Sequence, residues 1–119
     1  MSKTARTVFI FGFYLYAVGI TLLAAPNLLL GISGLPETSE VWIRVVGMLS
    51  LLIGFYYVQS ARLGLTMFFP LTVYARSMVF FFFLGFVLLG WAGTPLLLFG
   101  LVDLLGAGWT WMSIRGERN

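Results

Sequence analysis

The chain has 119 residues, of which 61% are hydrophobic and only 9% charged, and its formal net charge is +3. Soluble domains carry about 25% charged residues, so this composition excludes an ordinary soluble domain and predicts one integral membrane domain. The sequence contains no cysteine and no histidine, which excludes disulfides, thiolate or imidazole metal sites and proton transfer through imidazole. We therefore expect neither a metal site nor a bound cofactor.

The first apolar segment covers about residues 7–30, and a membrane-spanning helix needs roughly 20 residues. A basic start before an apolar run also resembles a signal peptide, but this run exceeds the about 7–15 apolar residues of such peptides. We therefore expect a retained helix that Pro26 kinks or ends. Gly12, Tyr16 and Gly19 share one face of this helix, a pattern typical of close packing against another helix.

Residues 31–40 form the first predicted loop, which carries the acidic residues Glu37 and Glu40 and no basic residue. Acidic residues suit the positive N-terminal end of a following helix. Thr38 or Ser39 is the expected cap of that helix.

The second apolar segment covers about residues 41–62 and carries Arg44 one turn inside its start. Gly47, Ser50 and Gly54 follow on one face, where small side chains let two helix backbones approach closely. A helix that faces lipid needs no such glycines and does not easily keep an arginine. This helix is therefore predicted to pack against other helices.

Residues 63–71 are apolar but too short to span, and we expect an interfacial turn with Phe68 and Phe69 in the headgroup region. The third span is expected over about residues 72–91, with its run of phenylalanines toward lipid. Arg76 lies near its start and is expected to extend its charged end to the membrane surface.

The fourth span is expected over about residues 95–114, with Asp103 near its middle. Gly100 and Ala107 share a face with Asp103, which predicts a small and polar seam toward the interior. Together the segments predict an all-α fold, in which residues 1–119 form a single transmembrane four-helix bundle.

The basic residues predict the orientation of the bundle. In a chain with four spans, six of the seven fall on one side, and the opposite side carries Glu37 and Glu40. The positive-inside rule then predicts that both termini are cytoplasmic in a multi-pass protein of the inner membrane. Membrane lipids are the expected partners, with a further membrane protein or a second copy of the chain as alternatives. Nucleic acid is not expected, because the positive charge lies at helix ends.

Two charged residues, Arg44 and Asp103, are not explained by this orientation. Each costs about 2.5–3.5 kcal/mol at the centre of a spanning helix, which favours pairing or an interior polar pocket. Their expected depths allow them to meet in the outer half of the bundle, where Tyr16 could donate a hydrogen bond to Asp103. Alternatively, Arg44 pairs with Glu40 one turn earlier at the surface, and Asp103 only clamps helices together.

A short chain with four spans, an arginine, a glycine three residues later and another glycine seven residues further on resembles the DoxX-like bacterial membrane proteins. The matching positions are Arg44, Gly47 and Gly54. The resemblance implies a four-helix fold and a link to redox and quinone contexts.

These features support two hypotheses about function. The first is a scaffold or subunit of a membrane assembly without catalysis, because no pair of nucleophile and base is visible. The second is a binding or transport module for a small hydrophobic molecule, such as a quinone or lipid, with Arg44, Asp103 and Tyr16 at the polar end of its pocket. A cavity that reaches Asp103 would favour the second, and a closed seam of small residues would favour the first.

Overall fold

The computed structural model describes residues 1–118, without the side chain of the last of them. This part of the chain forms five helices: α1 (Lys3–Ala24), α2 (Pro26–Ser33), α3 (Trp42–Leu63), α4 (Phe68–Leu88) and α5 (Leu96–Arg118). All except α2 are long and apolar enough to cross a membrane. The prediction of an all-α protein with four long apolar segments is therefore confirmed.

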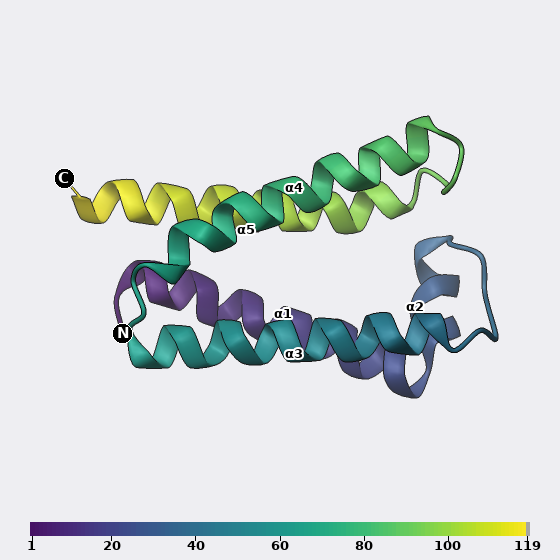
Figure 1. Cartoon of the computed structure of the whole chain (residues 1–119), viewed down its shortest axis with the longest axis horizontal. Coiled ribbons are helices and arrows are strands. Elements are labelled where there is room, and N and C mark those ends of the chain that lie inside the picture. Colours follow the sequence, from purple (N-terminus) through teal and green to yellow (C-terminus); the bar gives the residue numbers. More distant parts are fainter. Residues whose placement is uncertain (119) are drawn as a thin grey trace.

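The four long helices form two antiparallel pairs, α1 with α3 and α4 with α5 (Figure 1). Both termini lie at the same end of the molecule, and there the two pairs meet. Toward the other end, where α2 lies, the pairs diverge. The two pairs contact each other mainly through α1 and α5. The molecule therefore has a closed half at the termini and a more open half at the opposite end.

The first predicted span, residues 7–30, corresponds to two helices in the structure. α1 ends at Ala24, and Pro26 begins α2. Proline has no N–H group to continue a helix, and it is well suited to the first turn of a new one. α1 also begins earlier than expected, because the Ser2 side chain accepts a hydrogen bond of 3.0 Å from the backbone N–H of Ala5.

The start of α3 also differs from the expected cap. Neither Thr38 nor Ser39 caps it: its N-cap residue is Val41, without a side-chain hydrogen bond. The Thr38 hydroxyl instead accepts a bond from the backbone N–H of Glu40 at 3.1 Å. The Thr38 hydroxyl thus stabilises a turn that precedes α3 and does not cap the helix.

The predicted turn over residues 63–71 is shorter than expected. α3 ends at Leu63 and is capped by Gly64, whose φ of 66° is left-handed, and α4 already begins at Phe68. Pro70 is tolerated there because the first turn of a helix has no use for its missing N–H. Phe69 is 2% exposed and lies in the core cluster, which consists of Ala5, Val8, Phe11, Tyr57, Ala61 and Phe69. The expectation that Phe69 enters the headgroup region is therefore wrong.

Glycine contacts hold α1 and α3 backbone to backbone. Gly12 faces Gly54, and Gly19 faces Gly47, so the seven-residue spacing on one helix matches that on the other. A Cβ atom on Gly54 would lie 2.9 Å from the carbonyl oxygen of Gly12, and one on Gly19 would lie 2.7 Å from that of Gly47. Between these contacts, the Ser50 hydroxyl donates a 3.0 Å bond to a carbonyl of α1. This glycine seam, formed by the four glycines, leaves no room for side chains.

The second pair meets at a glycine as well. A Cβ atom on Gly100 of α5 would lie 3.3 Å from the Cα atom of Phe80 in α4 and 3.2 Å from the ring of Phe83. Here glycine accommodates aromatic side chains of α4. Phe81 and Phe82, on the other side of α4, are both 63% exposed, as expected for side chains that face lipid.

Candidate functional site

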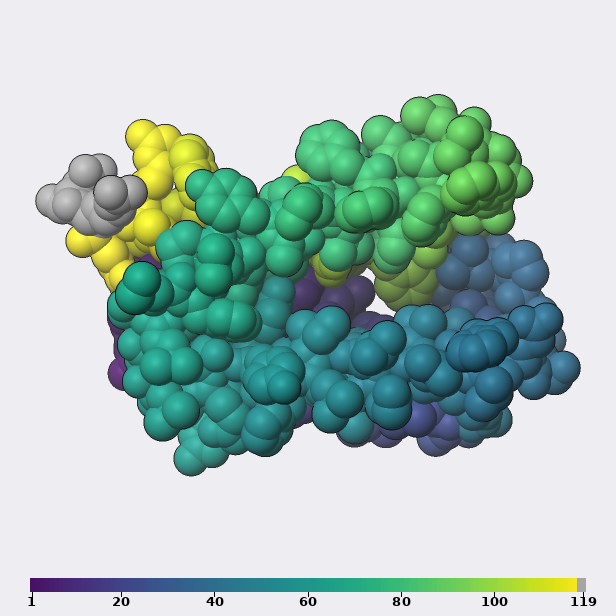
Figure 2. All heavy atoms as spheres, in the orientation of Figure 1, coloured from purple at the N-terminus to yellow at the C-terminus, as the bar shows by residue number. Residues whose placement is uncertain are grey.

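A cavity of about 220 Å³ lies between the two helix pairs in the open half of the molecule. Figure 2 shows the molecule hollowed there, between α3 in teal and α4 in green. All five helices contribute to its lining: Tyr14, Leu15, Val18 and Leu22 from α1, Leu29 and Leu30 from α2, Ile43, Val46 and Ser50 from α3, Phe83 from α4, and Leu96, Phe99 and Asp103 from α5, with Leu35 from the loop. The cavity is therefore almost entirely apolar.

Three lining side chains, those of Asp103, Tyr14 and Ser50, carry polar groups. The Ser50 hydroxyl already donates to the carbonyl of Leu15 at 3.0 Å. Asp103 and Tyr14 are consequently the polar side chains with which a bound molecule could form hydrogen bonds. We call this cavity the Asp103 cavity. A carboxylate in apolar surroundings is costly unless a partner compensates its charge, so a ligand that hydrogen-bonds to Asp103 would lower this cost.

Arg44 does not line the Asp103 cavity. Its guanidinium donates a hydrogen bond to the carbonyl of Leu23, in the last turn of α1. The final carbonyls of a helix lack partners within the helix, and they attract positive charge. Arg44 therefore caps α1, at the point where Pro26 has interrupted the helix.

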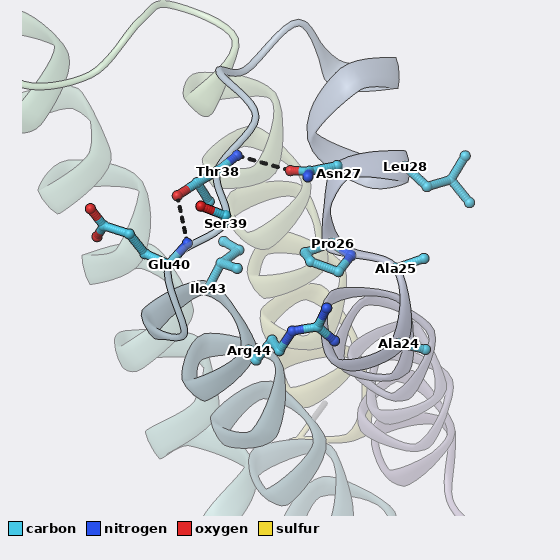
Figure 3. Close-up of a pocket in the computed structure, with 10 residues that line it drawn as sticks. All are labelled: Ala24, Ala25, Pro26, Asn27, Leu28, Thr38, Ser39, Glu40, Ile43 and Arg44. Carbon is cyan, nitrogen blue, oxygen red and sulfur yellow. Dashed lines mark hydrogen bonds between the residues drawn. The ribbon is translucent and has the colours of Figure 1, made fainter.

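Figure 3 shows the hollow of about 360 Å³ that Arg44 lines at this end of the molecule. Arg44 reaches toward Ala24 and Pro26, whereas Glu40 points away from it. Opposite Arg44, the side-chain oxygen of Asn27 accepts a 2.9 Å bond from the backbone N–H of Thr38. The structure thus shows Arg44 as a helix cap, in contact with neither Asp103 nor Glu40.

Tyr16 is also separated from Asp103. It lies on the face of α1 that packs against α3, with its ring beside Gly54 and 5.7 Å from the ring of Phe13. Tyr14, two residues earlier, lies on a different side of α1 and lines the Asp103 cavity. Residues two apart on a helix point in nearly opposite directions. The glycine face of α1, which singled out Tyr16 in the sequence, is the face that α3 occupies.

Arg76 is the charged residue that the structure brings into the interior. It is 2% exposed, which overturns the expectation that it extends to the membrane surface. Its guanidinium carbon lies 4.6 Å from the ring centre of Phe11 and 5.5 Å from that of Tyr57. Contacts of this kind between a cation and an aromatic face are favourable, most of all when water is excluded.

Two threonines accept hydrogen bonds from Arg76, and a third, Thr7, bonds to one of them. Its Nη2 atom donates to the hydroxyls of Thr72 at 3.0 Å and Thr110 at 2.7 Å, and its Nε atom donates to the carbonyl of Thr72 at 3.1 Å. The Thr110 and Thr7 hydroxyls are 2.8 Å apart, and the Thr7 hydroxyl donates to the carbonyl of Thr4. The hydrogen of Thr7 is thus used, so Thr110 must donate to Thr7. The Thr72 hydroxyl donates to the carbonyl of Phe69 at 2.7 Å, so both hydroxyl oxygens that Arg76 contacts turn lone pairs toward its positive charge.

One local pattern in the sequence indicates the buried position of Arg76, although it is weak. Thr72 lies four residues before Arg76 in an otherwise apolar helix, so the two share a face. At this spacing an arginine can donate hydrogen bonds to a threonine of its own helix. The two residues together form a polar stripe on the helix. The contribution of Thr7 and Thr110 depends on how α1 packs against α5, and no local pattern reveals it.

A third hollow, of about 610 Å³, lies at the termini and is lined by Lys3, Arg6, Thr7, Trp109, Met112, Ser113, Gly116 and Glu117. Here Glu117 accepts bonds from the backbone N–H of Thr4 at 3.1 Å and from its hydroxyl at 2.8 Å. The carboxylate thereby satisfies a free N–H group at the start of α1. This contact joins α5 to α1 and helps to close this half of the molecule.

Within the described residues, no group of three or more acidic side chains is placed to hold a metal ion. The arrangement offers an apolar cavity with a carboxylate and a phenol, and the buried guanidinium of Arg76 lies outside its lining. Such a site is suited to binding. No family model matches the sequence, and no curated protein or solved structure is detectably similar to it.

Proposed function

We propose that this protein is a multi-pass membrane protein that binds a small, mostly apolar molecule in the Asp103 cavity, without catalysing a reaction. One observation carries the proposal: an apolar cavity that all five helices line and that contains one carboxylate. Small-molecule sites are typically concave and apolar, with few polar groups that fix orientation. The cavity favours this role over that of a scaffold or subunit, for which a seam closed along the whole bundle is the expected arrangement.

The size of the cavity limits the ligand. Its volume of about 220 Å³ is below the about 300–1,000 Å³ of typical pockets for drug-sized molecules. A small molecule, or one end of a longer one whose tail extends into lipid, would suit this volume. The head of a quinone or the polar end of a lipid belongs to that class.

The ligand proposal is tested by labelling with a photoreactive alkyl alcohol, with the protein in lipid nanodiscs. We expect labelled peptides to include cavity residues such as Tyr14. Leu96→Phe fills the cavity and should abolish this labelling. Leu98→Phe is the matched control, because Leu98 lies on the same helix and is 56% exposed. Equal labelling of both variants would contradict binding in the cavity.

The same proposal includes insertion in the inner membrane with both termini on the cytoplasmic side. It is supported by four apolar helices and by Lys3, Arg6, Arg62 and Arg115, which belong to the helix ends near the termini. Arg76 no longer counts toward this charge bias because it is buried. Positive charge is enriched on the cytoplasmic side of membrane proteins.

Orientation can be measured with cysteines introduced at Ser2 and at Glu37. In intact cells or vesicles, an impermeant thiol reagent should label Glu37→Cys from the outside and Ser2→Cys only after permeabilisation. The natural chain has no cysteine, so the background is low. Labelling of both positions from the same side would contradict the orientation.

A further inference from the structure

The guanidinium of Arg76 has donors that its threonine partners do not use. Of the five N–H groups of an arginine, Nε uses one and Nη2 uses two in the bonds to Thr72 and Thr110. The Nη1 atom is buried and has no hydrogen-bond partner within the described residues. A buried donor of a charged group without an acceptor is costly. Some group near Nη1 should therefore carry the compensating charge.

Asp103 is placed to be that group. Nη1 lies 3.1 Å from the position that a Cβ atom on Gly106 would take. Asp103 precedes Gly106 by three residues on α5, so both lie on one face of the helix, about 5–6 Å apart at their Cβ positions. The absence of a side chain at Gly106 lets Nη1 and the ring of Phe11 lie close to the backbone of α5.

We propose that Arg76 is the counter-charge of Asp103, through one water between the two groups, and that this pairing selects an uncharged ligand that carries a hydrogen-bond donor. The inference rests on the proposed function and narrows its ligand class. With the pair formed, the polar end of the cavity has no net charge. A cationic ligand would compete with Arg76, and an anionic ligand would meet the Asp103 carboxylate. An ionised carboxylate only accepts hydrogen bonds, so the matching ligand group is a donor such as a hydroxyl.

The test uses three photoreactive probes with one alkyl chain and different end groups: hydroxyl, ammonium or carboxylate. Labelling of the cavity in nanodiscs at neutral pH is quantified by mass spectrometry. The natural chain should be labelled best by the hydroxyl probe. In Arg76→Gln, Asp103 loses its counter-charge, and the ratio of ammonium to hydroxyl labelling should rise about tenfold or more. In Asp103→Asn, the carboxylate probe should gain instead.

Arg62→Gln is the control for a change in net charge. Arg62 is exposed at the end of α3, so its replacement should leave all ratios unchanged. Preference of the natural chain for the ammonium probe would overturn the inference, because it would mean that Asp103 is not compensated. Ratios that stay the same in both Arg76→Gln and Asp103→Asn would overturn it as well.

A second measurement keeps the pairing testable if Arg76→Gln does not fold. Asp103→Asn nearly preserves the shape of the side chain, and Arg76→Lys preserves the charge. In a thermal double-mutant cycle, Asp103→Asn should lower the melting temperature less in the Arg76→Lys background than in the natural chain, because lysine has no Nη1 donor. Additive effects of the two substitutions would refute the pairing. If no probe labels the natural chain, the proposed function fails, and this cycle still decides whether Arg76 and Asp103 pair.

Discussion

α1 makes two contacts that differ along its length. Toward α3, it packs by the glycine seam from one end of the molecule to the other, and Gly12 and Gly19 allow the backbones to touch. Toward α5, it makes contact only in the half near the termini. There Phe11 lies against Gly106, and a Cβ atom on Gly106 would come within 2.6 Å of its ring. In the other half, the Asp103 cavity separates the two helices.

In this molecule, α1 packs closely against its neighbours where small residues or polar bonds lie between the helices. The seam with α3 has small residues throughout. The contact with α5 depends on Gly106 and on polar bonds, Thr7 with Thr110 and Thr4 with Glu117. Beyond Phe11, α1 presents Tyr14, and α5 presents Phe99 and Leu96. Large side chains without such bonds leave the cavity between the pairs.

The largest expected effect comes from removal of the charge that lies where the two pairs meet. Arg76→Met should lower the free energy of unfolding by about 3–5 kcal/mol, because it removes the buried guanidinium and leaves the half-buried carboxylate of Asp103 without compensation. Denaturation in detergent, followed by circular dichroism, measures the loss. Arg62→Met is the control, with an expected change within about 0.5 kcal/mol. A similar small loss for both variants would show that Arg76 does not hold the pairs together.

The glycine seam is tested by Gly54→Leu. A Cβ atom at this position would lie 2.9 Å from the carbonyl of Gly12, so the helices must separate, and we expect a loss of about 3 kcal/mol, at the upper end of typical overpacking costs. Leu52→Ala is the contrast, because Leu52 is 49% exposed. Equal melting temperatures for the two variants would mean that the seam tolerates a side chain.

A smaller effect is expected from Thr110→Val, which keeps the shape of the side chain and removes its hydroxyl. Arg76 loses an acceptor and Thr7 loses a donor, which should cost about 1–2 kcal/mol. Thr21→Val is the control: the Thr21 hydroxyl donates only to the carbonyl of Ala17 in its own helix, and its loss should cost less. If Thr21→Val proves the more destabilising variant, the bonds between α1 and α5 do not close this half.

The smallest effect on stability is expected in the cavity. Leu96→Phe should change the free energy of unfolding by less than about 1 kcal/mol, because the overpacking cost of about 1–3 kcal/mol applies to well-packed cores. Val58→Phe is the contrast. Val58 is 6% exposed and lies against Gly12 of the glycine seam, so this substitution should cost the full about 1–3 kcal/mol. A large loss for Leu96→Phe would indicate that the cavity is filled by side chains when the protein is in a membrane.

Much of the fold could be predicted from local patterns. Apolar segments of sufficient length predicted the four long helices, and Pro26 predicted the break after the first. The spacing of Gly47 and Gly54 predicted a packed face of α3, whose partner the structure identifies as α1. The site was harder to predict from the sequence, because Arg44 and Arg76 have similar surroundings in sequence. Each lies near the start of an apolar segment.

The sequence by itself determined that the chain is all-α, because its apolar segments have the length and composition of long helices and its few charges lie mostly at their ends. Only the tertiary structure decided which charged side chains lie in the interior of the molecule. Arg44 lies where α1 ends and caps its free carbonyls, whereas Arg76 lies where α1, α4 and α5 meet. The cost of a charged group depends on the partners within a few ångströms. Those partners come from segments far apart in the chain.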